Sequence, residues 1–136
     1  MLALSRKGFF LTLLITTLVL TGCVSATQRD QQQADEDKKL KNRLQLAINY
    51  IQSSDHDRAR DHLSRALEID SRSPEVHNLF ALLYEREREF DVAESHFKKA
   101  LRYAPDFTRT RNNYGSFLLR RGRAEEACRQ FKLGSE

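Results

Sequence analysis

The fold of this chain is decided by residues 74–105, which read PEVHNLFALLYEREREFDVAESHFKKALRYAP. Small residues at Ala81, Ala93 and Ala100 stand among large ones such as Phe80. This spacing predicts two short amphipathic helices joined by a tight turn. Where two helices cross, small residues let the backbones approach and large residues fill the space on either side.

The same order of small and large residues recurs every 34 residues. The matching columns are Leu46/Phe80/Tyr114, Ala47/Ala81/Gly115, Tyr50/Tyr84/Leu118, Ala59/Ala93/Ala127, Leu63/Phe97/Phe131 and Ala66/Ala100/Gly134. A repeat of this length predicts stacked helix pairs.

The columns resemble the tetratricopeptide repeat. The turn residues Ser54 and Arg88 depart from the glycine that this family favours, which Gly122 keeps. The aromatic residue usual at the fourth column is replaced by Arg43, His77 and Arg111.

We therefore predict an all-α tetratricopeptide-repeat solenoid over residues 40–136, with repeats at 40–73, 74–107 and 108–136, the last one incomplete. No stretch alternates with the period of two that a strand requires. The expected helices are 40–52, 56–69, 74–87, 90–103, 108–121 and 124–133. Because no polar capping helix follows, we expect a longer native chain, or else partly uncovered Phe117 and Phe131.

Residues 1–22 have the organisation of a secretory signal peptide. Basic Arg6 and Lys7 precede an apolar run of about 13 residues, which is too short for a ~30 Å hydrocarbon core. The sequence Leu-Thr-Gly-Cys that ends at Cys23 resembles the bacterial lipoprotein box, in which the cysteine is lipidated. The alternative is an ordinary signal peptide with an incidental cysteine. By the usual sorting convention, Val24 in place of aspartate implies the outer membrane, with the protein on its periplasmic face.

Residues 23–39 are predicted to be a lipidated N-terminus and flexible tether. The segment is rich in Gln, Asp and Lys and has almost no bulky apolar side chain, so it cannot bury enough surface to order itself. A tether of this length lets the domain hang clear of the lipid headgroups, and the several acyl chains of a lipoprotein anchor give stable attachment.

No arrangement of residues predicts catalysis, a cofactor, a metal site or a small-molecule substrate. The four histidines lack metal-ligand spacing, and there is no glycine-rich phosphate loop or serine elbow. Cys128 has no histidine in its own repeat to activate it, so we interpret it as a small buried or half-buried residue. Five arginines gather in repeat three, as a solvated face or as a site for an acidic partner or anionic lipid: Arg109, Arg111, Arg120, Arg121 and Arg123. A periplasmic chain is not expected to bind nucleic acid.

The first helix of each repeat is expected to line a groove that binds a protein partner. This expectation rests on the resemblance to tetratricopeptide folds, whose second, fifth, ninth and twelfth columns face the groove. The groove residues predicted in this way are Leu44, Ile48, Ile51, Asn78, Leu82, Asn112 and Leu119. The apolar first repeat suits an amphipathic helix or apolar strip of a partner. Alternatively, the tether or neighbouring repeats cover these residues.

One local string narrows the resemblance. Residues 112–118 read NNYGSFL, after Ala-Pro-Asp at 104–106 and before Glu-Glu-Ala at 125–127. With the signal, lipoprotein box, polar tether and repeats in this order, the chain resembles the type IV pilus biogenesis and stability lipoproteins, the PilF or PilW family. The resemblance implies a pilotin, a non-enzymatic outer-membrane lipoprotein that binds the pilus secretin subunit and assists its localisation and multimerisation.

Another interaction function remains open from the sequence. A tetratricopeptide lipoprotein of the same architecture can act as a scaffold for outer-membrane barrel assembly or recruit cell-wall hydrolases. Neighbouring genes for a secretin, or capture of a secretin, would separate these two functions.

Overall fold

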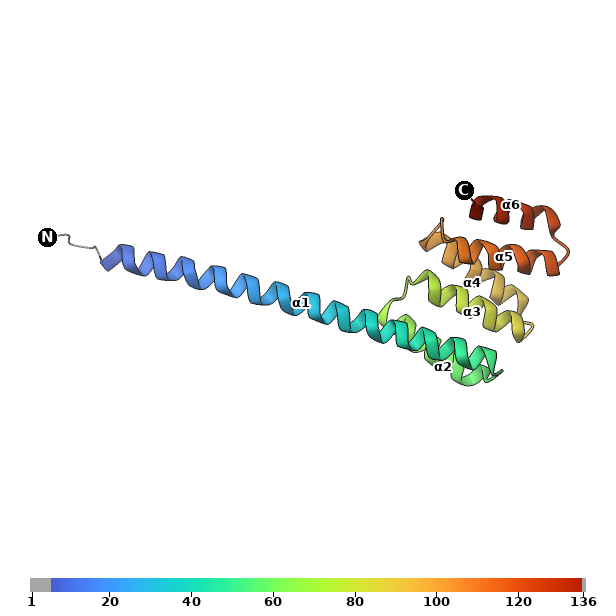
Figure 1. Ribbon diagram of the computed structural model, residues 1–136, viewed down its shortest axis with the longest axis horizontal. Helices are drawn as coiled ribbons and strands as arrows, with labels where there is room; N and C mark the ends of the chain where they lie inside the picture. Colours follow the sequence, from blue (N-terminus) through green and yellow to red (C-terminus); the bar gives the residue numbers. More distant parts are fainter. Residues whose placement is uncertain (1–5, 136) are drawn as a thin grey trace. The chain divides into compact units, whose positions relative to one another are not determined.

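The structure, a computed structural model, describes the backbone of residues 6–135 and the side chains of residues 27–135. The described part consists of six α-helices without a strand (Figure 1). In order they are α1 (Arg6–Gln52), α2 (His56–Ile69), α3 (Pro74–Arg86), α4 (Phe90–Tyr103), α5 (Thr108–Arg120) and α6 (Ala124–Ser135). The predicted all-α fold is confirmed. The bounds of α2 and α4 are those expected, α3 and α5 end one residue earlier, and α6 ends two residues later.

The chain divides into two units, residues 1–38 and residues 39–136. The sequence predicts an irregular tether over residues 23–39, but α1 continues through this segment. Two features explain the helix: residues 23–52 contain no Gly or Pro, and Ala, Gln, Glu and Lys are good helix formers. Gln33 also donates a hydrogen bond to Asp37 one turn further on, at 3.2 Å. The side chains of residues 27–38 are exposed except for half-buried Glu36. This part of the helix is therefore explained by the helix propensity of its residues and not by the burial of apolar side chains.

The three helix pairs end their first helices in the same way. Ser54, Arg88 and Gly122 all have positive φ, at 60°, 65° and 75°. In each turn the next residue donates its N–H to a carbonyl five residues back, for example from Glu89 to Tyr84 at 2.9 Å. This is the Schellman pattern, in which a left-handed residue closes the helix. The backbone therefore repeats every 34 residues even where the glycine does not.

Alanine columns make the helix crossings tight. The side chains at Ala59, Ala93 and Ala127 are fully buried. At Gly115 an added Cβ would lie only 2.7 Å from the Phe131 ring, so glycine is required for the close approach of α5 and α6. The buried residues form two clusters that cover the junctions between successive repeats.

The two ends of the core differ from what the sequence suggests. Leu46 occupies the same repeat column as the buried residues Phe80 and Tyr114, but it is 40% exposed. Its counterpart Tyr114 stacks on Phe97 of the preceding repeat with ring centroids 5.4 Å apart, whereas the described residues contain no helix pair before the repeat of Leu46. Phe117 and Phe131 were expected to be partly uncovered unless the native chain is longer. Phe117 is only 1% exposed and packs in the second core cluster. Phe131 is half-buried.

Candidate protein-binding groove

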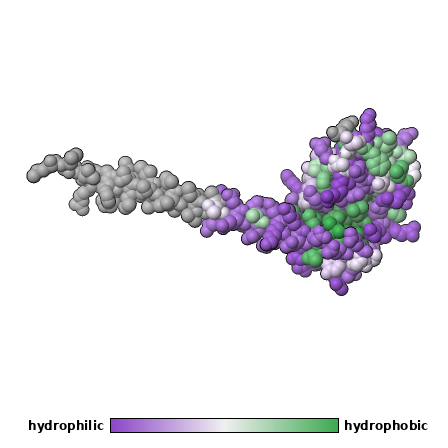
Figure 2. Space-filling view, in the orientation of Figure 1, coloured by the Kyte–Doolittle hydropathy of each residue, from purple (hydrophilic) through white to green (hydrophobic). Residues whose placement is uncertain are grey.

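The predicted groove residues lie on α1, α3 and α5, and we call the side of the domain that these first helices line the groove face. Their burial differs greatly. Ile51 and Asn78 are buried, at 5% and 2% exposure, while Leu119 is 51% exposed. Leu44, Ile48 and Leu82 are half-buried, and Asn112 is exposed. Figure 2 shows an apolar area bordered by hydrophilic residues where α1 and α3 face the viewer.

Two of the predicted residues are covered by side chains of the next repeat. Ile51 belongs to the first core cluster together with Phe80 and Leu83 of α3. Asn78 accepts a hydrogen bond from the Asn113 amide of α5 at 3.0 Å. The sequence placed both residues on the correct helices but did not show these cross-repeat contacts. Leu44 and Leu82 also pack on the first and second core clusters, respectively, and each leaves part of its side chain exposed.

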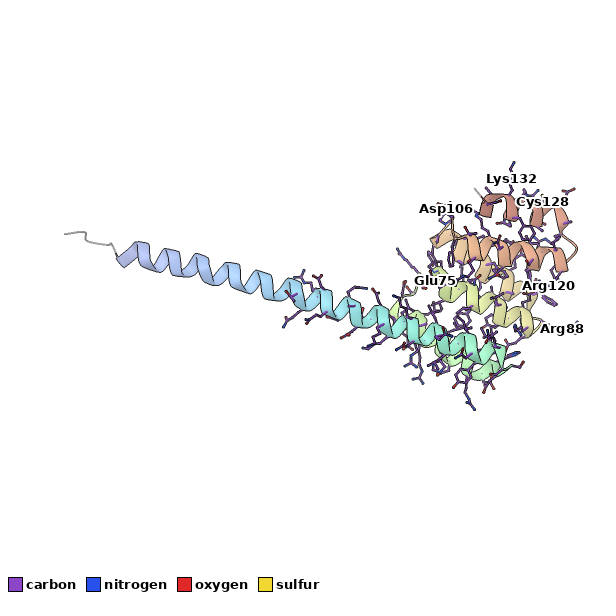
Figure 3. All side chains as sticks on the ribbon, in the orientation of Figure 1. Glu75, Arg88, Asp106, Arg120, Cys128 and Lys132 are labelled. Atoms are coloured by element: carbon purple, nitrogen blue, oxygen red, sulfur yellow. The ribbon has the colours of Figure 1, made fainter. Side chains whose placement is uncertain are left out.

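A hollow of about 340 Å³ brings part of the predicted groove together. It is lined by Ile51, Leu82, Glu85, Arg86 and Arg120. Arg120 lies at the end of α5 on the same side of the domain as Arg88, away from Glu75 and Asp106 (Figure 3). The hollow therefore lies near the turns that join the first and second helices, and we call it the turn-end hollow.

An ion pair between repeats forms one wall of the turn-end hollow. Arg120 donates from Nε and Nη2 to the two carboxylate oxygens of Glu85, at 2.8 and 3.0 Å. The Glu85 side chain is 16% exposed and that of Arg120 is 57% exposed. Such two-point pairing fixes the direction of the guanidinium group. Arg86, also exposed, has no ion-pair partner among residues 27–135.

A larger hollow, of about 790 Å³, lies between α1 and α2 on repeat one. It is lined by seven polar or charged residues and by only two apolar ones, Leu46 and Ile69. Asp61 and Arg65, both in its lining, pair with each other at 3.0 Å. This composition is that of a solvated edge of the solenoid, so the turn-end hollow is the better candidate for an apolar contact.

The unusual fourth column has a structural reason that sequence analysis missed. In every repeat its side chain meets the residue 19 positions later on the second helix: Arg43 with His62 at 3.2 Å, His77 with His96 at 3.1 Å, and Arg111 with Gln130 at 2.9 Å. A polar pair thus replaces the usual aromatic contact between the helices. The constant offset of 19 in the aligned repeats is the signal from which the pairs can be found.

The arginines of repeat three are mostly engaged within the domain. Arg111 donates hydrogen bonds to Gln130 and the Pro105 carbonyl. Two arginines form ion pairs, Arg120 with Glu85 and Arg123 with Glu94 and Glu126. The other two lie near aromatic rings, Arg121 over Phe90 at 4.0 Å and Arg109 near Phe107 at 5.9 Å. These contacts favour a structural role for the cluster over an open basic surface.

Glu94 is the centre of the strongest of these networks. Hydrogen bonds from Arg123 lower the pKa of the Glu94 carboxyl to about 2, against the opposing effect of burial. Tyr114 donates its hydroxyl to Glu94 at 2.7 Å, and Lys98 adds an ion pair at 2.9 Å. The network ties α4 to α5 and to the turn before α6.

Among residues 27–135, no three His, Cys, Asp or Glu side chains are grouped so that they could hold a metal ion. Cys128, which we expected to be buried or half-buried, is exposed, because it follows Ala127 and the helix turns it away from the packed face. Cys23 lies outside the residues whose side chains are described.

The part of the chain that the structure describes also contains no helix with the length and hydropathy needed to cross a membrane.

Comparison with known proteins identifies the class to which this fold belongs. The sequence pattern of the tetratricopeptide repeat matches residues 78–132. Together with three helix pairs at a 34-residue interval, this match assigns the fold to the tetratricopeptide-repeat class. Such repeats are generally protein-interaction modules.

Within that class, the chain is similar to the type IV pilus assembly protein PilF of Pseudomonas aeruginosa. The two are 33% identical over 119 residues, which cover 86% of this chain and 47% of PilF. A solved structure of Pseudomonas aeruginosa PilF superposes with a TM-score of 0.73 at 32% identity, over 75% of this chain and 46% of that one. An uncharacterised protein of Haemophilus influenzae is 28% identical over 90% of this chain and 67% of its own length. The chain thus spans about half the length of PilF.

Proposed function

We propose that this chain is part of an outer-membrane lipoprotein that acts as a protein-interaction module in type IV pilus assembly. The observation that carries this proposal is the similarity to PilF over 86% of the chain. In this role the protein binds the pilus secretin subunit and assists its localisation and multimerisation. Lipidation at Cys23 holds the protein at the periplasmic face of the outer membrane.

The groove face is the part of the domain that we assign to the partner. Leu119, at 51% exposure, and the half-buried Ile48 and Leu82 offer apolar surface, which the partner buries on binding. Complete burial of a fully exposed apolar side chain contributes about 1.5–3 kcal/mol, and these partly buried side chains contribute a fraction of that before the costs of association are subtracted. The interaction is non-catalytic, and the specificity comes from the shape and charge of the groove face.

The anchor and the partner are tested in one experiment on the full-length lipoprotein. Cells producing wild-type protein or Cys23→Ala are labelled with palmitate, fractionated, and assayed for detergent-resistant secretin multimers. We expect the wild type to be labelled, to fractionate with the outer membrane and to capture the secretin, and Cys23→Ala to lose the label and the multimers. Equal palmitate labelling of Cys23→Ala would refute the anchor.

Capture also tests the identity of the partner. A pull-down that recovers outer-membrane barrel assembly factors or cell-wall hydrolases, with no secretin, would replace the pilus role by that of another scaffold. Val24→Asp adds a test of sorting, because the variant is expected to move toward the inner membrane. An unchanged distribution would show that the sorting convention does not govern this protein.

A further inference from the structure

The repeat places two residue pairs in corresponding positions of the turn-end hollow. Glu85 and Arg120 are 35 positions apart and join repeats two and three. Moving both positions back by the 34-residue repeat gives Ile51 and Arg86, which join repeats one and two. All four side chains line the same hollow.

The two pairs differ in one chemical respect. Arg120 pairs with a carboxylate from the preceding repeat, whereas the residue that corresponds to this carboxylate for Arg86 is Ile51, which has a hydrocarbon side chain. Among residues 27–135 no carboxylate pairs with Arg86. The lining of the hollow carries two guanidinium groups and one carboxylate, so its charge is positive by one. An anionic group therefore complements it.

We propose that the turn-end hollow binds a partner segment in which a carboxylate side chain lies next to a large apolar side chain. The carboxylate pairs with Arg86 in the way that Glu85 pairs with Arg120. The apolar side chain packs on Ile51 and Leu82. This proposal rests on the proposed function, because it names the chemistry of the partner segment that the groove face receives.

The size and composition of the hollow set the length of the segment. A volume of about 340 Å³ accommodates one or two side chains and not a small folded unit. Ile51 and Leu82 give an apolar floor, and Arg86 stands at the exposed edge. A carboxylate that replaces water there gains a charge-assisted hydrogen bond, and the neighbouring apolar group gains from desolvation.

The Glu85–Arg120 pair leads to a further prediction, in which a substitution raises the affinity for the partner segment. Glu85→Gln removes the carboxylate that occupies Arg120, so both guanidinium groups of the hollow become available to the ligand. Affinity for an acidic segment is then expected to rise, although a wall of the hollow has been altered. A merely structural role of Glu85 predicts the reverse.

The test uses three synthetic peptides of nine residues on the full-length lipoprotein in detergent. One peptide contains Leu-Glu-Glu-Leu at its centre, the second replaces both glutamates by lysine, and the third replaces both leucines by serine. Binding is followed by fluorescence anisotropy and located by NMR shifts. We expect the first peptide alone to bind, with shifts at Ile51 and Leu82.

Variants then assign the contacts. Arg86→Gln is expected to weaken binding of the acidic peptide about fivefold, and Glu85→Gln to strengthen it by a similar factor. The matched control is Arg102→Gln, an exposed arginine on α4, which is expected to leave the affinity unchanged. Equal binding of the lysine peptide, or equal affinity of Arg86→Gln and the wild type, would overturn the proposal.

Secretin capture with the same variants separates this proposal from the proposed function. If wild type captures the secretin and Arg86→Gln captures it equally, the contact at Arg86 is refuted while the pilus role stands. If wild type captures no secretin but binds the acidic peptide through Arg86, the pilus role is refuted and the ligand chemistry stands.

Discussion

The Nδ1 atoms of His77 and His96 lie 3.1 Å apart and join the two helices of repeat two. The Nε2 atom of His77 lies 3.3 Å from the Ser71 carbonyl, which can only accept a hydrogen bond. The proton of His77 is therefore on Nε2, and His96 donates from Nδ1 to the free Nδ1 of His77. A second proton on His77 would place two N–H groups face to face.

This arrangement predicts that the domain loses stability in mild acid. Burial lowers the pKa of His96 to about 4 and also lowers that of His77, with Lys99 adding to both effects. As the pH falls through the unfolded pKa of about 6.5, the unfolded chain binds more protons than the folded domain, so the free energy of unfolding falls. His96 is only partly buried, so solvent screening reduces the loss from pH 7 to pH 5 to on the order of 1 kcal/mol.

Thermal unfolding measured from pH 7 to pH 5 checks this expectation. His96→Gln introduces the side chain that repeat three has at Gln130, and its melting temperature is expected to depend less on pH over this range. The Glu94 carboxyl acts separately, because its lowered pKa affects stability only below about pH 4.5. Identical pH profiles for His96→Gln and wild type would contradict the assignment.

Arg88→Gly is expected to stabilise the domain. Arg88 has φ of 65°, a left-handed conformation that costs a residue with a Cβ roughly 1–2 kcal/mol, and its side chain is exposed. Glycine removes this cost but adds freedom to the unfolded chain, so the net gain is about 0.5–1 kcal/mol. Chemical denaturation measures it.

The control for this variant is Arg102→Gly, the same substitution inside a helix. Arg102 is exposed and lies in α4, so glycine relieves no strain there and is expected to destabilise. If both variants lower the stability by the same amount, the positive φ at Arg88 is not a source of strain.

Ala93→Leu tests the packing of the helix crossings. The Ala93 side chain has no exposed surface, and overpacking there is expected to cost about 1–3 kcal/mol in unfolding free energy. Ser95→Leu, an exposed position on the same helix, is the matched control and should change little. Glu94 does not serve as a control, because its replacement removes the contacts with Arg123 and Tyr114. Equal melting shifts for the two leucine variants would contradict this packing.

The sequence was sufficient to predict the repeat and the helices, because both depend on local spacing. Alanines at 59, 93 and 127 mark the crossings, and Ser73 caps α3 by accepting a hydrogen bond from the Val76 N–H at 3.3 Å. The position of each predicted groove residue on a first helix also followed from the repeat.

What the sequence did not reveal depends on pairs of residues from different repeats. Ile51 and Leu119 occupy the same column, yet one is 5% and the other 51% exposed, because α3 covers Ile51. The burial of Asn78 depends in the same way on Asn113. Each of these contacts depends on the side chain that the neighbouring repeat places against the residue. The sequence of a single repeat does not contain that information.

The central claim is that the groove face binds the pilus secretin, and capture of secretin by charge-bearing variants tests it most directly. Ile48→Glu and Leu119→Glu each place a carboxylate where the partner would have to desolvate it, at a cost of several kcal/mol. Val92→Glu, on α4, is the matched control, since Val92 is also an exposed apolar residue, at 39%. Circular dichroism and melting temperature first establish that each variant is folded, which the 51% exposure of Leu119 favours most.

The measurement is the amount of secretin recovered from membranes by each folded, full-length variant. The account predicts that Val92→Glu recovers as much secretin as wild type and that Leu119→Glu loses at least nine-tenths of this recovery. The same loss is expected for Ile48→Glu if that variant folds. A loss of this size corresponds to about 1.4 kcal/mol or more of binding free energy. Folded Leu119→Glu and Ile48→Glu that both recover as much secretin as wild type would contradict the account.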